Sequence, residues 1–536
     1  NVYPAWYDVR PWYFRRLDRD GRMMRELLET LREKNELKSI GIGEYGAGGS
    51  IHRHNNDPFH ALPYYQHDDA EEYQAAYHYC NYRAIRDDDK VWGSFIWQMF
   101  DSGSDLQHEP GRPGCNTKGL VEFDHQTPKD AFYFYKAVWN PEPMLHLTGS
   151  RKKSVTNLTT VVFGFCNAGK VEFFLNGEKY GEQTPDDLAA VVWENVPLKP
   201  GKNTIELKCG NLMERMTLQA PDRVRIAADE QNPVTAFKAA AAKLGPAGGV
   251  IEFEHGEYRI PESSATDMRF YISNHDQSDV HRVVFPIVGA TNLTVEGSGS
   301  ILIFGGKPIP FAVIDSLGVT LKRFSVDSSY AFMPELVITG FKDGKTIARM
   351  DPALYPHRVK DGRLLFSGEG WEYPVHHAKL FDGKTRELVE RSGDILYQGQ
   401  ATELAADMLA LEYDFSKRGK GGKIGDVVVL RPPFRPCPGI FVAGSQNITL
   451  EDVAIHSSLG MALIVQRSGN VTWRGTGSPE DRKSGVFPRK ATGRYASAHA
   501  DASHFSNVKG QVTVENCLFE GMMDDAINVH STCLFV

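Results

Sequence analysis

The sequence lacks the features that mark membrane-spanning, zinc-binding and nucleic-acid-binding proteins. No uninterrupted apolar run reaches the length of about 18 residues that a spanning helix needs, so we expect no membrane span. The seven cysteines are widely spaced and form no C-x-x-C pair, which argues against a zinc site or dithiol chemistry. With 60 Lys and Arg against 68 Asp and Glu, the net charge is −8, and no global positive field is present to attract nucleic acid. Neutral or hydroxyl-rich ligands fit this balance better.

The remaining composition is that of an ordinary globular chain. Its 536 residues are 41% hydrophobic and 24% charged, and at roughly 100 to 200 residues per domain this length predicts three or four domains. Neither end has the pattern of a natural terminus: the chain starts at Asn1 without a basic leader, and it stops at Val536 within an apolar run. We therefore expect both ends to be truncations. The oligomeric state stays open.

The first 220 residues change character near residue 142. Helical patterns over 18–37 and 71–86 alternate with strand patterns over 38–42 and 91–99, which predicts part of an α/β barrel over residues 1–142. Short β runs with Asn-Gly and Pro-Gly turns then predict an Ig-like β-sandwich over residues 143–220. In α/β barrels the chemistry lies on loops at the carboxyl ends of the strands.

From residue 222 a weak repeat of the form N-x-T-[VLW] predicts a parallel β-helix, whose coils bury their apolar side chains against one another. The threonines that align are Thr294, Thr320, Thr449, Thr472 and Thr513. The separations of 26 and 23 residues suit one coil, the last one, of 41, would contain a long loop over 479–497, and the gap of 129 from Thr320 to Thr449 is too long. We therefore predict a β-helix over 222–327 and 436–536 with an inserted β module over 328–435, and a mainly β, multidomain chain.

Glu44 is the first candidate for catalysis. It follows the strand predicted over 38–42 and precedes a loop of small residues that a large ligand could approach, as expected of a glycosidase nucleophile. Trp97 could stack on a sugar ring. Taken alone, however, both residues have simpler readings, as a solvated acid at a strand end and as a core aromatic.

Asp501, Asp524 and Asp525 are the second candidate. Asp501 is separated from the other two by 23 and 24 residues, about one coil. Side chains alternate along a strand, so regular structure would place at most one of the pair beside Asp501, but a bend at Gly521 could bring all three into one cleft. Close carboxylates can divide the roles of acid and base.

The simpler interpretation of this second group is a pair of turn aspartates and an unrelated acid. Three histidines flank the acids, namely His499, His504 and His530, although a single histidine is more often structural. A metal site is possible in principle, but no tight ligand spacing supports one. We therefore expect neither a metal nor a cofactor.

Several strings in the first part of the chain resemble glycoside hydrolase family 2. They are the opening Asn1 to Tyr7, with Ala5 at a family glycine, Gly43 to Gly46, Val91 to Phe100, Lys118 to Val121 and Lys129 to Pro143. The resemblance implies that Glu44 is the nucleophile and that Asn1, Tyr3 and Trp97 shape the sugar pocket. It also implies that the acid/base glutamate precedes residue 1, so that the β-galactosidase part is incomplete.

Residues 222–536 resemble glycoside hydrolase family 110. The strings that carry this resemblance are Tyr271 to Gln277, Val288 to Asp327, Arg431 to Gly444 and Asp524 to His530. It implies an inverting exo-α-1,3-galactosidase on a right-handed β-helix with an inserted β-barrel, acting without metal on galactose-terminated glycans. It also implies that Asp501, Asp524 and Asp525 are catalytic, and we place His530 with the substrate.

We therefore predict a secreted bacterial glycosidase, periplasmic or extracellular, that removes terminal galactose. One alternative is a β-galactosidase whose β-helix only binds glycan. Another is a glycan-binding β-helix without catalysis. A third is a polygalacturonase-like β-helix, against which the negative charge argues because its substrate is a polyanion.

Overall fold

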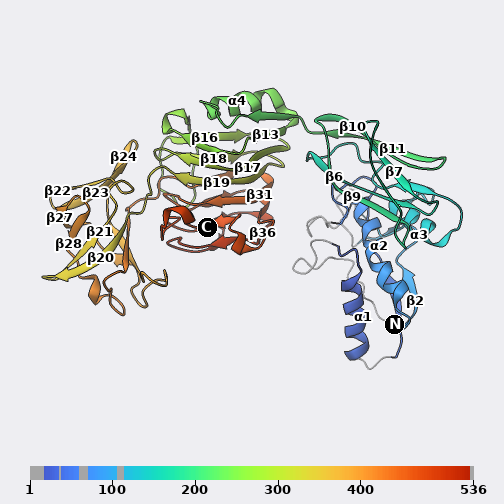
Figure 1. The fold of residues 1–536 in the computed structure, drawn as a ribbon, viewed down its shortest axis with the longest axis horizontal. Helices are drawn as coiled ribbons and strands as arrows, with labels where there is room; N and C mark the ends of the chain where they lie inside the picture. The colour runs from blue at the N-terminus through green and yellow to red at the C-terminus, as the bar shows by residue number, and fades with distance from the viewer. Residues whose placement is uncertain (1–16, 35–37, 60–69, 106–113, 532–536) are drawn as a thin grey trace. The chain divides into compact units, whose positions relative to one another are not determined.

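The computed structural model describes residues 17–34, 38–59, 70–105 and 114–531. They belong to two compact units, residues 1–222 and 223–536, so the division falls where the predicted β-sandwich ends and the predicted β-helix begins. The fold is mainly β, arranged in several sheets (Figure 1). Within the described ranges, every helix is too short or too polar to cross a membrane.

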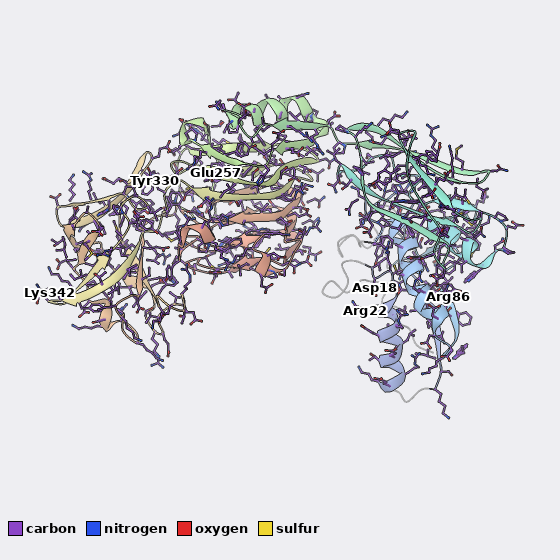
Figure 2. The ribbon with its side chains drawn as sticks, in the orientation of Figure 1. Asp18, Arg22, Arg86, Glu257, Tyr330 and Lys342 are labelled. Atoms are coloured by element: carbon purple, nitrogen blue, oxygen red, sulfur yellow. The ribbon has the colours of Figure 1, made fainter. Side chains whose placement is uncertain are left out.

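The first unit begins with alternating helices and strands. In chain order these are α1 (Arg22–Lys34), β1 (Ile40–Tyr45), α2 (Glu71–Asp87), β2 (Val91–Ile96), β3 (Ser102–Gly103), β4 (Cys115–Asn116) and α3 (Asp130–Trp139). Asp18 accepts a hydrogen bond from the Arg22 backbone N–H, at 2.8 Å, at the start of α1 (Figure 2). The parallel strands β1 and β2 pair Ile40 with Val91 and Tyr45 with Ile96. Because β1 runs from Ile40 to Tyr45, the predicted bounds 38–42 are wrong, but Glu44 lies at the carboxyl end of the strand, as expected.

Two antiparallel sheets complete the first unit. The strands of one sheet are β5 (Leu145–Leu147), β6 (Thr159–Cys166) and β9 (Ala190–Pro197), and those of the other are β7 (Val171–Leu175), β8 (Glu178–Gln183), β10 (Gly201–Cys209) and β11 (Leu212–Ala220). Buried side chains from both sheets, including Val162, Phe173 and Leu207, form one core. This arrangement fits the predicted sandwich.

The second unit contains three ladders of parallel strands, which we call the coil stack. The first ladder comprises β12 (Arg223–Ile226), β13 (Gly249–Phe253), β17 (Leu293–Phe304), β19 (Thr320–Ser328), β31 (Gln446–Ile455), β33 (Gly469–Arg474) and β36 (Lys509–Glu515). The second joins the later residues of β17, β19 and β31 to β14 (Glu257–Ile260), β34 (Gly485–Val486) and β37 (Leu518–Phe519). The third comprises β16 (His281–Val288), β18 (Ile309–Ile314), β30 (Ile440–Ala443), β32 (Leu463–Gln466), β35 (Ser503–Ser506) and β38 (Ile527–His530), with the antiparallel β15 (Thr266–Met268) at its start.

The threonines of the repeat occupy equivalent positions in neighbouring strands of the first ladder. The five threonines pair in the predicted order. Thr294 pairs with Thr320, Thr320 with Thr449, Thr449 with Thr472 and Thr472 with Thr513. The residue after each threonine points into the stack, as in the buried Leu321, Leu450 and Trp473. The helix α4 (Pro233–Leu244) covers one end of this core with Val234 and Phe237 (Figure 1). The predicted alignment of the repeat is therefore confirmed.

The 129-residue gap in the repeat is filled by antiparallel strands between β19 and β30. A seven-stranded sheet comprises β20 (Glu335–Lys342), β21 (Lys345–Arg349), β25 (His377–Phe381), β26 (Ile395–Leu396), β27 (Ala401–Ala405), β28 (Met408–Leu411) and β29 (Val427–Arg431). A three-stranded sheet comprises β22 (His357–Lys360), β23 (Arg363–Gly368) and β24 (Trp371–Pro374). The strand order of the larger sheet is open, so its closure into a barrel stays a prediction.

Candidate active site

The three aspartates of the second candidate lie together at one edge of the third ladder. One oxygen from each of Asp501, Asp524 and Asp525 lies within 4.8 Å of the other two. The strands that follow them, β35 and β38, pair Ser503 with Ile527, and the Ala502 N–H donates to the Asp525 carbonyl at 2.9 Å. Asp525 is therefore the equivalent of Asp501 one coil later.

Asp524 joins the group because the chain bends before β38. Residues 521–526 are not part of a strand, so the alternation of side chains does not apply to them. Gly521 adopts a positive φ of 74°, and a Cβ at this position would lie 2.3 Å from the Tyr495 carbonyl oxygen. The bend predicted at Gly521 is present. Because of it, the side chains of the adjacent Asp524 and Asp525 both lie close to Asp501.

The three carboxylates differ in their surroundings. Asp501 is 2% exposed and lies between two fully buried alanines, whereas Asp524 and Asp525 are exposed. The Arg435 guanidinium lies 3.5 Å from Asp524, and the Asn528 amide donates to Asp525 at 2.9 Å. One acid is thus fixed inside the fold and two are free to meet a ligand.

Two of the three flanking histidines connect to Asp501. His504 Nδ1 lies 2.8 Å from Asp501 Oδ2, and His504 Nε2 lies 2.7 Å from His530 Nε2. His499 instead donates its Nε2–H to the Pro432 carbonyl at 3.0 Å, and burial lowers its pKa to about 3, which keeps the ring neutral. His499 is structural, while His504 and His530 belong to the acidic group.

Residues 271–277, which we call the strap, lie against the same ladder. Gln466 accepts from the Ser273 N–H at 2.9 Å and donates to the Tyr271 carbonyl at 2.8 Å. The Asn274 amide lies 3.1 Å from His504 Nε2 and 3.4 Å from His530 Nε2. In the sequence this string stands out only by its family resemblance. Its place beside the acids could not be predicted, and neither could the contact of Arg435 with Asp524. No local pattern links residues so far apart in the chain.

The acidic group is also the cluster that could hold a cation. The three carboxylates offer oxygen ligands at suitable separations, but exposed acidic groups often cluster without an ion. We therefore assign no metal or cofactor to this group, and their absence stays a prediction.

Glu44 lies in a different setting, in the first unit. It is half-buried near the end of β1. Trp97 follows β2, and its backbone N–H donates to the Tyr45 carbonyl at 2.9 Å. Trp97 is 41% exposed, unlike a core aromatic. The other two residues predicted for this pocket, Asn1 and Tyr3, lie outside the described residues.

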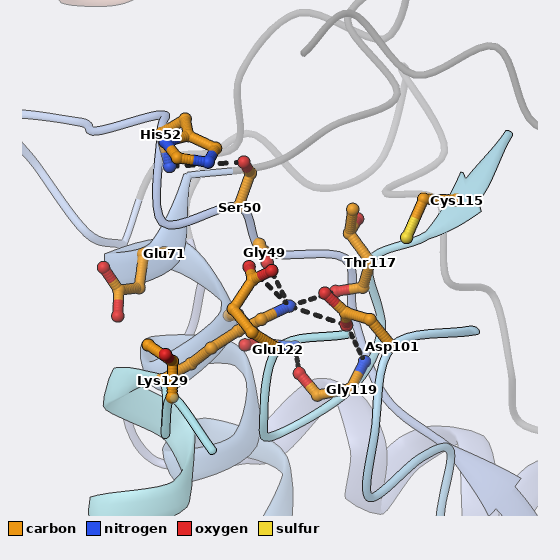
Figure 3. Close-up of polar contacts among 12 residues, drawn as sticks. Gly49, Ser50, His52, Glu71, Asp101, Cys115, Thr117, Gly119, Glu122 and Lys129 are labelled. Carbon is orange, nitrogen blue, oxygen red and sulfur yellow. Dashed lines mark hydrogen bonds and ion pairs between the residues drawn. The ribbon is translucent and has the colours of Figure 1, made fainter. Parts of the chain in front are cut away.

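The small residues after Glu44 are explained by packing. A Cβ at Gly46 would lie 2.2 Å from the Trp97 carbonyl oxygen. The fully buried Lys129 donates to the carbonyls of Gly49 and Thr117, at 2.6 and 3.0 Å, and to Asp101 at 2.8 Å (Figure 3). A Cβ at Gly49 would lie 2.5 Å from Gln74 Cβ. Close contacts therefore account for Gly46 and Gly49, and the expectation that this loop admits a ligand stays a prediction.

The loop that leads to Asp501 is anchored by a carboxylate of the insert. Glu335 accepts the N–H groups of Tyr495 and Ala496, at 2.8 and 2.9 Å. Burial raises the pKa of Glu335 to about 7, so the folded state binds this proton more tightly than the unfolded chain does. The resulting stability is present below the unfolded pKa and is lost as the pH rises through about 7.

Substitution Glu335→Gln should abolish this pH dependence, because the amide oxygen can accept the same two bonds without a charge. At pH 8 we expect the variant to be more stable than the wild type by about 1–2 kcal/mol, below the full value of the pKa shift because the side chain is only half-buried. At pH 4, below the ordinary pKa of a glutamate in the unfolded chain, the two should be alike. Thermal melts at both pH values check this result, with the exposed Glu403→Gln in β27 as the control. An equal difference at both pH values would contradict it.

Comparison with known proteins finds similarity in both units. Residues 335–427 match the family model described as GLAA-B beta-barrel domain I, and residues 158–209 match a domain of unknown function, DUF4982. The chain is 41% identical over 308 residues to alpha-1,3-galactosidase B of Akkermansia muciniphila, covering 57% of this chain and 37% of that protein. It is 34% identical over 290 residues to alpha-1,3-galactosidase B of Parabacteroides distasonis, covering 54% and 46%.

Other relatives carry a different name. The chain is 38% identical over 208 residues to a beta-glucuronidase of Bacteroides fragilis, covering 39% of this chain and 28% of that protein. Among solved structures, Bacteroides uniformis beta-glucuronidase is 22% identical, with a TM-score of 0.33, and the match covers 43% of this chain and 27% of that one. The chain thus spans less than half the length of these relatives.

Proposed function

We propose that this chain belongs to a glycosidase that removes terminal α-linked galactose from glycans, acting at Asp501, Asp524 and Asp525. The observation that carries the proposal is the convergence of these three carboxylates, from neighbouring coils, within 4.8 Å. The similarity to proteins named alpha-1,3-galactosidase B supports galactose and the α-1,3 linkage as the substrate. The match to a domain named for GLAA-B supports the same assignment.

The proposed architecture has a fragment of a family 2 glycosidase over residues 1–220 and most of a family 110 enzyme over 222–536. In the latter, the coil stack is a right-handed parallel β-helix and the strands within 328–435 form a β-barrel. The parallel ladders and the threonine register support the β-helix. We further propose that the enzyme acts in the periplasm or outside the cell, where glycans of this kind are met.

The proposed reaction is a single displacement. One aspartic acid donates its proton to the glycosidic oxygen as the bond to the galactose anomeric carbon breaks, and an aspartate takes a proton from the water that attacks that carbon from the opposite face. The products are galactose of inverted, β, configuration and the shortened glycan. The third carboxylate binds a galactose hydroxyl or tunes its neighbour.

The spacing of the carboxylates places a condition on this mechanism. Inverting glycosidases hold the acid and base roughly 6.5–9.5 Å apart to admit a water, whereas here the nearest oxygens lie within 4.8 Å. Asp524 and Asp525 are exposed and lie in a bend, so we propose that one of them rotates away when a galactoside enters. A structure with bound galactose in which the carboxylates keep the present spacing would contradict inversion.

Glu44 supports a second candidate function, a retaining β-galactosidase with the coil stack as a glycan-binding module. The position of Glu44 beside Trp97 near the ends of two parallel strands favours it. A glycan-binding coil stack without catalysis would show saturable galactoside binding and no sugar release.

Hydrolysis of α- and β-linked nitrophenyl galactosides by the full-length protein tests these alternatives. We expect release from the α-galactoside, with β-galactose as the first product in a time course of NMR spectra. α-Galactose as the first product would overturn the inverting mechanism. Release from the β-galactoside alone, lost in Glu44→Gln, would replace the proposal by the second candidate.

A further inference from the structure

The burial of Asp501 requires a partner for its charge. The residue is 2% exposed, between Ala500 and Ala502, which are fully buried. A buried carboxylate without a hydrogen-bond donor is strongly unfavourable. His504, also fully buried, lies three residues further along the chain with Nδ1 at 2.8 Å from Asp501 Oδ2. His504 is the side chain that satisfies this carboxylate.

The contacts of His504 fix which ring atoms carry protons. A carboxylate accepts hydrogen bonds, so His504 Nδ1 carries a proton and donates it to Asp501. The 2.7 Å separation between His504 Nε2 and His530 Nε2 requires a proton between the two nitrogens, because two lone pairs would repel at that distance. The Asn274 amide, 3.1 and 3.4 Å from the same nitrogens, closes the chain of contacts.

The residues of this hydrogen-bonded series, His504 and Asn274 among them, are held in place by the surrounding strands. His504 lies in β35 and pairs in register with Ile464 of β32 and Asn528 of β38. Asn274 is held by the strap, which both ends of the Gln466 amide anchor. A neutral His275, whose pKa burial lowers to about 4, accepts the Met461 N–H and fastens the strap further.

We propose that His504 is a positioning residue for Asp501, and that His530 and Asn274 fix the ring of His504 in turn. The inference rests on the proposed function, since it gives the positioned carboxylate a role in galactoside hydrolysis. His504 holds Asp501 Oδ2 and so fixes the Asp501 carboxylate within the group in which one oxygen of each aspartate lies within 4.8 Å of the others. It does not touch the sugar, so its loss should lower kcat and leave KM little changed.

Two substitutions separate the hydrogen bond of His504 to Asp501 from the space that the His504 side chain fills. His504→Leu fills the space without a donor, and we expect kcat to fall by about 100-fold, within the range that a misplaced acid or base costs. His504→Asn keeps a donor at the place of Nδ1, and we expect it to recover about tenfold of that loss. Steady-state kinetics on an α-1,3-galactoside measures both. A Leu variant with wild-type kcat, or an Asn variant no better than Leu, would overturn the proposal.

A matched control is available elsewhere in the coil stack. His456 is buried and bonded to the Phe487 carbonyl at 2.9 Å through Nδ1, and the acids are not among its contacts. His456→Asn should leave kcat unchanged, and thermal melts should show all three variants folded. A loss of kcat in His456→Asn equal to that in His504→Leu would mean that the effect is structural, against the proposal.

Crystal structures provide a readout that needs no turnover. In His504→Leu we expect the Asp501 carboxylate to turn from its wild-type position, and in His504→Asn to keep it. An unmoved carboxylate in the Leu variant would overturn the positioning role even if the enzyme is a galactosidase. If the wild type releases no galactose, the proposed function fails, while this comparison still decides whether His504 holds Asp501.

Discussion

Replacing Asp525 with asparagine is expected to lower the release of α-linked galactose by about 100- to 10,000-fold, the usual contribution of a positioned acid or base. The substitution keeps the shape of the side chain but removes the carboxylate that stands one coil from Asp501. Binding of the galactoside should change little, so the loss should appear in kcat. Initial rates of sugar release from an α-1,3-galactoside measure the effect.

The matched control for this experiment is Asp452→Asn. Asp452 also lies at a corner of the coil stack, where it bonds the N–H and the hydroxyl of Thr476, at 2.7 and 2.6 Å. We expect its variant to retain wild-type kcat. A near wild-type rate in Asp525→Asn would remove this residue from the mechanism, and a full loss in Glu44→Gln instead would move the chemistry to the first unit.

Replacing Lys129 with methionine is expected to destabilise the first unit by about 3–5 kcal/mol, as found when one partner of a buried ion pair is removed. The ammonium group donates to Asp101 and to two backbone carbonyls (Figure 3). Burial already raises the pKa of Asp101 to about 6, and Lys129 opposes that rise. Without Lys129, Asp101 would have to bind a proton or remain charged with no cation beside it, keeping only the Gly119 N–H as a donor among the described residues.

Hydrogen exchange of the peptides around Gly49 and Thr117 measures this loss locally, which suits a chain of several domains better than a single unfolding transition. Lys170→Met, which breaks the exposed pair with Glu182, should leave the protection of these peptides unchanged, because exposed ion pairs contribute little to stability. The double variant Lys129→Met/Asp101→Asn should recover part of the stability. Unchanged protection in Lys129→Met would contradict the assigned role.

The sequence predicts the coil stack well because its signal is local and repeated. Each coil places a threonine at the same register and an apolar residue after it, so Thr294, Thr320 and Thr449 could be aligned without coordinates. The same one-coil spacing led to Asp501 and Asp525. Strand alternation alone would exclude Asp524, and Gly521 is the local signal for the bend that includes it. The predicted bounds of the strand before Glu44 are wrong, because β1 is longer than its apolar run.

The supporting residues of the acidic group could not be found in this way. Asn274 meets His504 across 230 residues of chain, and Glu335 meets Tyr495 across 160. Such pairings depend on where the strap and the insert fold back against the third ladder. Periodicity carries no information about these contacts, since neither segment is periodic.

The long sequence separation between the strap and its partners has a consequence for the synthesis of the protein. The residues of the strap leave the ribosome before their partners, since His504 follows Asn274 by 230 residues and His530 follows it by 256. Contacts with such long sequence separation form late and slowly. A nascent chain that ends before Asp501 would therefore have no competence for hydrolysis, although it already contains the strap and the first ladder as far as β33.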